Sequence, residues 1–238
     1  MKKTVTVILA FVLTSVSLLG CSSSAVLTEE TVWQETEAAK PKKKVAKEKK
    51  VTAAVKGHPI VWLGDSLTQG SLGDNNDNLP NAPYEKLKAM AGVPVEGYGF
   101  YGYNTHDIFW VYRAESQLNQ KRDPNKTYIF WVGSNDWVKD GVPNTETSGV
   151  INEIDKFISD GVQISNYIVI GTTARYELGD SYKIINKALK DHYGTHYLDV
   201  ADVIGPNGYI EDRIHLKQVS YDAVALAVYN KLIAMGYL

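Results

Sequence analysis

Residues 60–70 read IVWLGDSLTQG, a short apolar run followed by a glycine and a polar segment that contains a serine. The β-branched and aromatic residues of 60–63 predict a buried β-strand. Ser66 follows near the carboxyl end of this strand, where a hydroxyl is well placed to attack a carbonyl if a base and N–H donors lie nearby. The segment is not the GxSxG elbow of α/β-hydrolases, because Thr68 stands where that motif has glycine. Taken alone, it is equally compatible with a helix-capping turn.

Short apolar runs alternate with longer amphipathic segments throughout the chain beyond Gly57. This alternation predicts a parallel sheet with helices on both faces, because parallel neighbours need long crossover connections. In such sheets, ligands bind at the carboxyl ends of the strands. The predicted strands are 60–63, 93–96, 128–132, 167–171 and 196–199. The predicted helices are 83–91, 105–119, 146–160, 180–192 and 220–235.

Two further segments follow predicted strands and contain groups that can bind an anion. The first, GYGFYGYNT at 97–105, has three glycines within six residues, which indicates a loop whose backbone N–H groups can approach a ligand closely. The second, GSND at 133–136, offers the amide of Asn135 as a donor to a developing oxyanion. Each segment is also compatible with an ordinary turn that binds no ligand.

A fourth segment, DRIH at 212–215, lies just before the last predicted helix. Asp212 and His215 are three residues apart, so the carboxylate can hold the imidazole in one tautomer and leave the other ring nitrogen to accept a serine proton. A surface turn is the alternative interpretation of the pair. If the interpretation as a base is right, the neutral imidazole is the active form and activity should fall in acid.

Together, the four segments resemble those of the SGNH (GDSL) hydrolase family, which is named for its Ser, Gly, Asn and His. The resemblance covers essentially all of residues 58–238, with the motifs in the family's order. It implies an α/β protein with a three-layer α/β/α sandwich and a five-stranded parallel sheet of flavodoxin-like order. It further implies that Ser66 is the nucleophile, His215 the general base and Asp212 its orienting carboxylate. The oxyanion would be held by the backbone N–H groups of Ser66 and Gly102 and by the side chain of Asn135.

The chain departs from the family pattern in two places. Family members often have an Asn before the glycines of the second motif, whereas this chain has EGY at 96–98. Gly102, rather than Gly99, is therefore assigned as the donor from its place ahead of Thr105. Family members commonly have Gly after the triad Asp, whereas this chain has Arg213, a long cation that either reaches the cleft or points to solvent.

The amino-terminal part has the features of an export and tethering segment. Residues 1–20 place two lysines before an apolar run too short for a stable membrane span, which predicts a lipoprotein signal peptide. The run ends in LLGC, which resembles a lipobox, so Cys21 is the predicted lipidation site; an ordinary signal peptide with an incidental cysteine is the alternative. Residues 21–56 predict a disordered Lys-rich tether, either a solvated spacer or a ligand for anionic lipid or wall polymer. Residues 57–238 form the predicted hydrolase domain.

We therefore expect an exported lipoprotein, anchored through Cys21 on the outer face of a bacterial cell membrane. The chain is 44% hydrophobic and 22% charged, as in ordinary globular proteins, and its single cysteine has no internal partner for a disulfide. Residues 1–56 carry a net charge of +5 and residues 57–238 a net charge of −7, and so acidic a domain argues against nucleic acid as a partner. The histidines outside the motifs have no metal-ligand spacing, and the predicted chemistry requires neither a metal nor an organic cofactor.

The predicted reaction is ester hydrolysis in two steps through an acyl-enzyme on the serine. Aromatic residues near the motifs could stack on sugar rings if exposed, although buried rings would belong to the core. Proximity to wall polysaccharide makes O-deacetylation of carbohydrate the first hypothesis. Hydrolysis of lysophospholipid or other lipid esters is the second, and a non-catalytic glycan-binding lipoprotein is the third. The candidate substrate-binding residues are Tyr101, Tyr103, Trp110, Trp137 and Arg213.

Overall fold

The computed structural model describes residues 57–74, 81–136, 138–139, 142–143 and 147–238. The predicted signal peptide, the lipidation site at Cys21 and the tether lie outside these residues, as does Trp137. In the part of the chain that the structure describes, no helix is both long enough and apolar enough to cross a membrane.

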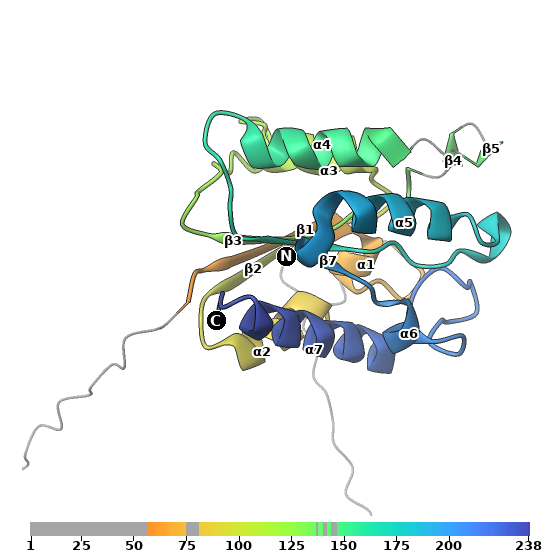
Figure 1. The fold of residues 1–238 in the computed structure, drawn as a ribbon. Coiled ribbons are helices and arrows are strands. Elements are labelled where there is room, and N and C mark those ends of the chain that lie inside the picture. Colours follow the sequence, from red (N-terminus) through yellow and green to blue (C-terminus); the bar gives the residue numbers. More distant parts are fainter. Residues whose placement is uncertain (1–56, 75–80, 137, 140–141, 144–146) are drawn as a thin grey trace, which may run out of the picture. The chain divides into compact units, whose positions relative to one another are not determined.

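Five parallel strands form the central sheet, as the sequence predicts (Figure 1). They are β1 (Ile60–Asp65), β2 (Val95–Phe100), β3 (Thr127–Trp131), β6 (Tyr167–Ile170) and β7 (Tyr197–Leu198). Their order in the sheet is β2-β1-β3-β6-β7, which is the flavodoxin-like order that the resemblance implies. The strand that precedes Ser66 therefore has a hydrogen-bonded neighbour on each side. A separate antiparallel pair is formed by β4 (Val138–Lys139) and β5 (Val142–Pro143).

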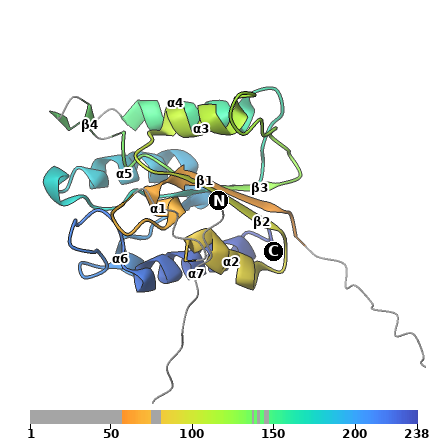
Figure 2. The same cartoon turned by 180° about the vertical axis from the view of Figure 1, so that it is seen from behind.

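Helices cover both faces of the sheet, which gives three layers (Figures 1 and 2). Alternation of side chains along β1 explains the arrangement, because successive residues of a strand point to opposite faces. Val61 and Leu63 pack in one apolar cluster, whereas Ile60 and Trp62 pack in the other. The first cluster is covered by α3 (Thr105–Arg113), α4 (Thr147–Ser159) and α5 (Tyr182–Tyr193). The second is covered by α2 (Pro83–Ala91), α6 (Ala201–Ile204) and α7 (Gln218–Ala234).

The glycine-rich segment differs from its sequence interpretation, because β2 continues through Gly97 and Gly99 instead of ending before them. Both glycines allow close packing against the strand. A Cβ on Gly97 would lie 2.0 Å from Cγ of Tyr84 in α2, and a Cβ on Gly99 would lie 2.2 Å from the backbone nitrogen of Gln69. Of the three glycines, only Gly102 has a positive φ, 77°, in the turn that follows the strand. The predicted loop is therefore wrong for the first two glycines.

Helix ends also differ from the prediction. α3 ends at Arg113 instead of residue 119, because Ala114 adopts extended backbone with φ −67° and ψ 128°. A turn follows, in which the backbone N–H of Gln117 donates to the carbonyl of Ala114, and Asn119 has a positive φ of 48°. α7 begins at Gln218, two residues before its predicted start.

Candidate active site

Ser66 begins α1 (Ser66–Gln69), a single helical turn that follows β1 without an intervening loop. Asp65 is the N-cap, and its Oδ1 accepts a hydrogen bond of 2.9 Å from the backbone N–H of Leu67. At the other end, Gly70 takes a left-handed conformation, and its N–H and that of Ser71 donate to carbonyls of the turn. The strand–turn junction thus fixes the Ser66 side chain at the carboxyl edge of the sheet.

The structure brings Ser66, His215 and Asp212 together in one relay. The Oγ of Ser66 lies 2.9 Å from Nε2 of His215, and Nδ1 of the same ring lies 2.6 Å from Oδ2 of Asp212. Ser66 and His215 are both buried, with 6% and 5% of their surface exposed. These are the distances at which an imidazole can take a proton from the hydroxyl while the carboxylate holds its tautomer.

Asp212 is held by its own turn. Its Oδ1 accepts hydrogen bonds of 2.9 Å from the backbone N–H groups of Ile214 and His215. Burial acts to raise the pKa of the Asp212 carboxyl, but the hydrogen bonds from the His215 ring and from the two backbone N–H groups outweigh it and lower that pKa below its usual value. The carboxylate therefore remains charged opposite the imidazole.

Tyr101 lies over the imidazole of the relay. Its ring is stacked on that of His215, with centroids 5.6 Å apart and planes 12° apart. The position follows from the turn after β2: the backbone N–H of Tyr103 donates to the carbonyl of Phe100, and Gly102 supplies the positive φ that the third position of such a turn requires. Tyr101, proposed from the sequence as a substrate-binding residue, thus contacts the candidate base.

Asn135 has its amide oriented by two neighbouring segments. Its Nδ2 donates to the carbonyl of Tyr103 at 3.0 Å, and its Oδ1 accepts from the guanidinium of Arg175 at 3.2 Å. The same guanidinium donates to the carbonyl of Ser134 at 3.0 Å. An amide nitrogen carries two hydrogens, so the bond to Tyr103 uses one of them. Sequence reasoning missed Arg175, because nothing in the local pattern after β6 indicates that its side chain reaches the GSND segment.

Asp136 joins the two loops that hold the candidate oxyanion donors. Its Oδ2 accepts hydrogen bonds from the backbone N–H of Thr105 at 3.0 Å and from its hydroxyl at 2.8 Å. Burial raises the pKa of Asp136, although the hydrogen bonds from Thr105 act in the opposite direction. The last residue of GSND therefore caps the start of α3 together with Asn104, a role that the sequence analysis did not predict.

Asp65, directly before the nucleophile, is a buried carboxyl with an unpartnered oxygen. It is 1% exposed, and no hydrogen-bond donor among the described residues reaches its Oδ2. Burial raises the pKa of Asp65 to about 7, against the hydrogen bond from Leu67, which lowers it. This carboxyl is therefore poised to change its charge near neutral pH.

Arg213 occupies a position that favours glycine. Its φ is 55°, which costs a residue with a side chain about 1 kcal/mol relative to glycine. Its guanidinium lies 4.4 Å from the centre of the Tyr176 ring, within range of a cation–π interaction. Arg213 therefore lines a cavity beside the relay, where its side chain is also exposed to solvent.

The remaining aromatic candidates differ in their surroundings. Tyr103 is 42% exposed, stacks on Phe100 with ring centroids 5.7 Å apart, and accepts the hydrogen bond from Asn135 through its carbonyl. Trp110 is 52% exposed on α3. Trp137 lies outside the described residues. Among the described residues, no three His, Cys, Asp or Glu side chains gather as metal ligands.

Fold and site together define a three-layer α/β protein with a Ser–His–Asp relay at the carboxyl edge of its sheet. Comparisons with family models and with curated proteins found no match. Solved structures with this fold include a member of the lipolytic G-D-S-L family from Veillonella parvula DSM 2008, with 17% identity, a TM-score of 0.58, and 72% of this chain and 96% of that chain covered. A carbohydrate acetylesterase from Sinorhizobium meliloti has 18% identity and a TM-score of 0.56, over 75% and 99% of the two chains. A lipase/acylhydrolase from Enterococcus faecalis has 18% identity and a TM-score of 0.53, over 75% and 96%. The expected fold is thereby confirmed as the one found in G-D-S-L hydrolases.

Proposed function

We propose that this protein is a serine esterase that acts through an acyl-enzyme on Ser66 and removes O-acetyl groups from carbohydrate. The observation that carries the proposal is the continuous relay from the Ser66 hydroxyl through His215 to Asp212, with distances of 2.9 and 2.6 Å. A buried nucleophile thus meets, in hydrogen-bond geometry, a base and its carboxylate from a segment that lies 149 residues further along the chain. A glycan-binding protein without turnover would have no need of this arrangement, which favours the enzyme over the third hypothesis.

The proposed reaction begins when Nε2 of His215 takes the proton of the Ser66 hydroxyl as its oxygen attacks the ester carbonyl. The negative charge that develops on the carbonyl oxygen is held by the backbone N–H groups of Ser66 and Gly102 and by Nδ2 of Asn135. His215 then protonates the departing alcohol, which leaves the acyl group on Ser66. Water, activated by the same imidazole, repeats the attack and releases the acid.

Two observations support carbohydrate as the alcohol part of the substrate. Tyr103 and Tyr176 expose large parts of their rings, and exposed aromatic rings are surfaces on which sugars stack. The similar fold of a protein described as a carbohydrate acetylesterase fits this substrate class. A lipid ester is the second candidate, favoured by the similar fold of a protein described as a lipase/acylhydrolase and by the membrane anchor that the sequence predicts.

The proposal includes export and attachment to the outer face of the cell membrane through lipid on Cys21. The support is the LLGC sequence at the end of the predicted signal peptide. Metabolic labelling with an alkyne fatty acid should mark the wild-type protein and leave Cys21→Ala unlabelled. A soluble, unlabelled wild-type protein would refute the anchor without affecting the esterase proposal.

The esterase proposal is tested with p-nitrophenyl acetate, butyrate and decanoate, comparing wild type with Ser66→Ala and His215→Ala. We expect hydrolysis by the wild type, covalent labelling of Ser66 by a fluorophosphonate, and loss of both in Ser66→Ala. Acetate release from O-acetylated glycan, measured beside the acyl-chain profile, separates the carbohydrate from the lipid candidate. Equal, negligible rates for wild type and Ser66→Ala, with no label, would overturn the esterase proposal.

A further inference from the structure

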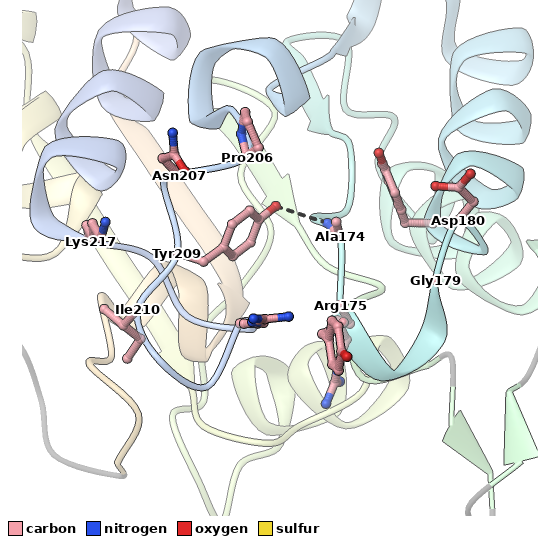
Figure 3. A pocket seen from close by; sticks show the side chains of 12 residues that line it. Ala174, Arg175, Gly179, Asp180, Pro206, Asn207, Tyr209, Ile210 and Lys217 are labelled. Carbon is pink, nitrogen blue, oxygen red and sulfur yellow. Dashed lines mark hydrogen bonds between the residues drawn. The ribbon is translucent and has the colours of Figure 1, made fainter.

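A cavity of about 570 Å³ is lined by Arg213, which lies between Asp212 and His215 in the sequence. Figure 3 shows the side chains that line this cavity. One side is formed by the segment that follows β6 and the other by residues between 206 and 217. A hydrogen bond of 3.2 Å from the backbone N–H of Ala174 to the hydroxyl of Tyr209 joins the two sides, as the dashed line in Figure 3 shows. The volume is typical of sites for small molecules, about 300–1,000 Å³, and the proposed acyl transfer does not use it.

This cavity continues toward the candidate active site. A second cavity, of about 720 Å³, is lined by Gly73 and by Asp212 itself. It shares Tyr209, Ile210 and Lys217 with the first cavity, so the two adjoin along the turn. A long substrate could therefore occupy the first cavity while another part of it lies beside the relay.

The first cavity is lined by three cations, Arg175, Arg213 and Lys217. Of its described lining residues, the single acid is Asp180, which already forms an ion pair of 2.9 Å with Lys183. In the part of the chain that the structure describes, neither Arg213 nor Lys217 pairs with a carboxylate. Such a concentration of positive charge in a domain with a net charge of −7 favours an anionic ligand at this place.

Aromatic rings accompany the cations. Tyr176, Tyr182 and Tyr209 line the cavity, and Tyr176 is 72% exposed beneath the guanidinium of Arg213. A guanidinium binds carboxylate and phosphate in a bidentate manner, and tyrosine rings pack against sugars. Of the described lining residues, only Ile210 has a large aliphatic side chain, so the lining suits a polar glycan better than an acyl chain.

We propose that this cavity binds the acidic group of a negatively charged, O-acetylated glycan. Arg213 and Lys217 hold a carboxylate or a phosphate of one sugar, while an acetyl ester elsewhere on the same chain reaches Ser66. The inference rests on the proposed esterase function and deepens it, because it names acidic carbohydrate as the substrate class.

The test compares substrates that differ only in charge. Partially O-acetylated polygalacturonate is used with its carboxylates free and after their conversion to methyl esters, and kcat/KM for acetate release is measured on both. A second pair, acetylated glucose 6-phosphate and its neutral dimethyl phosphate ester, tests recognition of phosphate. Because a partly exposed ion pair contributes up to about 1 kcal/mol, we expect about a fivefold preference for a charged member. The preference should shrink as salt is raised, because salt screens exposed charges.

Three variants assign the preference to the cavity. Arg213→Gly removes the cation and suits the left-handed backbone, so its fold should be at least as stable as that of the wild type. Lys217→Gln removes the second cation, and both variants should bring the ratio of the two kcat/KM values close to one. Lys156→Gln removes an exposed cation on α4, which supplies none of the described lining residues, and should leave the ratio unchanged.

A preference for the charged member of the carboxylate pair indicates a uronate-bearing glycan. A preference for the charged member of the phosphate pair indicates a phosphorylated glycan. Either preference supports the inference if Arg213→Gly abolishes it. Equal rates on charged and neutral members, or a preference that survives in both cavity variants, overturn it. If p-nitrophenyl acetate is hydrolysed but none of these sugars is deacetylated, the anionic glycan is refuted and the esterase stands. If p-nitrophenyl acetate is not hydrolysed either, the proposed function itself fails.

Discussion

The buried carboxyl of Asp65 should make the stability of the fold depend on pH in a direction opposite to that of most carboxylates. In the unfolded chain Asp65 loses its proton near the ordinary carboxyl value of 3.8, whereas in the fold burial raises its pKa to about 7. Between these values the unfolded state is ionised and the folded state holds the proton. The free energy of unfolding therefore falls as pH rises from about 4 to about 7. Above about pH 7, Asp65 adds no further pH dependence.

The interval between the two pKa values of Asp65 sets the loss in unfolding free energy between pH 4 and 7 at about 4 kcal/mol, as an upper limit. Asp65→Asn removes the titration but keeps an oxygen that can accept the hydrogen bond from Leu67. Its added N–H donors bring a cost of about 1–3 kcal/mol that does not change with pH. The difference in unfolding free energy, variant minus wild type, should therefore grow in the variant's favour between pH 4 and 7.

The assay is urea unfolding of wild type and Asp65→Asn at half-unit steps from pH 4 to 8, followed by circular dichroism. Taking the difference at each pH cancels the titration of those shared groups that do not interact with Asp65. A difference that stays constant across the range would refute the reasoning, since it would mean that Asp65 titrates alike in the folded and unfolded chains. A difference that changes in the opposite direction would mean that the folded state stabilises the charge.

Three further predictions concern the donors, the base and the sheet. Asn135→Ala should lower kcat on p-nitrophenyl acetate about 100- to 1,000-fold with a small change in KM, because it removes a donor used in the transition state; an unchanged kcat would exclude Asn135 from the oxyanion site. Tyr101→Leu should lower kcat about fivefold, because the ring face that stabilises the imidazolium is lost, whereas Tyr101→Phe should retain most activity; equal losses would contradict a role for the ring. Gly97→Ala should destabilise the fold by about 1–3 kcal/mol in thermal unfolding, because the added Cβ overlaps a tyrosine ring. Gly149→Ala, in α4 with open space around it, is the matched control and should be neutral or stabilising.

The sheet could be predicted from the sequence because its strands carry local signals. The apolar runs of β1 and β3 are recognisable without any knowledge of their partners, and the order of the motifs predicted the topology through the family resemblance. The glycines of β2 were interpreted as a loop, because close packing against Tyr84 depends on a helix that lies elsewhere in the chain. Helix ends were missed where a turn residue, such as Asn119, acts through its backbone conformation.

Some contacts of the candidate site could likewise be predicted from local sequence, and others could not. The spacing of Asp212 and His215 is local, so their hydrogen bond could be anticipated, and the placement of Ser66 followed from the strand before it. Arg175 and the stacking of Tyr101 on the imidazole could not be anticipated, because both contacts join segments far apart in sequence. No motif marks either contact, and each depends on the final packing of the loops.

The distance along the chain between nucleophile and base has a consequence for biogenesis. Ser66 directly follows β1, the first strand among the described residues, whereas His215 follows 149 residues later, just before α7. Any intermediate in which the last segment has yet to dock holds a hydroxyl with no group to deprotonate it. Esterase activity can therefore serve as a readout of complete folding, because a chain whose last segment has yet to dock should be unable to attack esters.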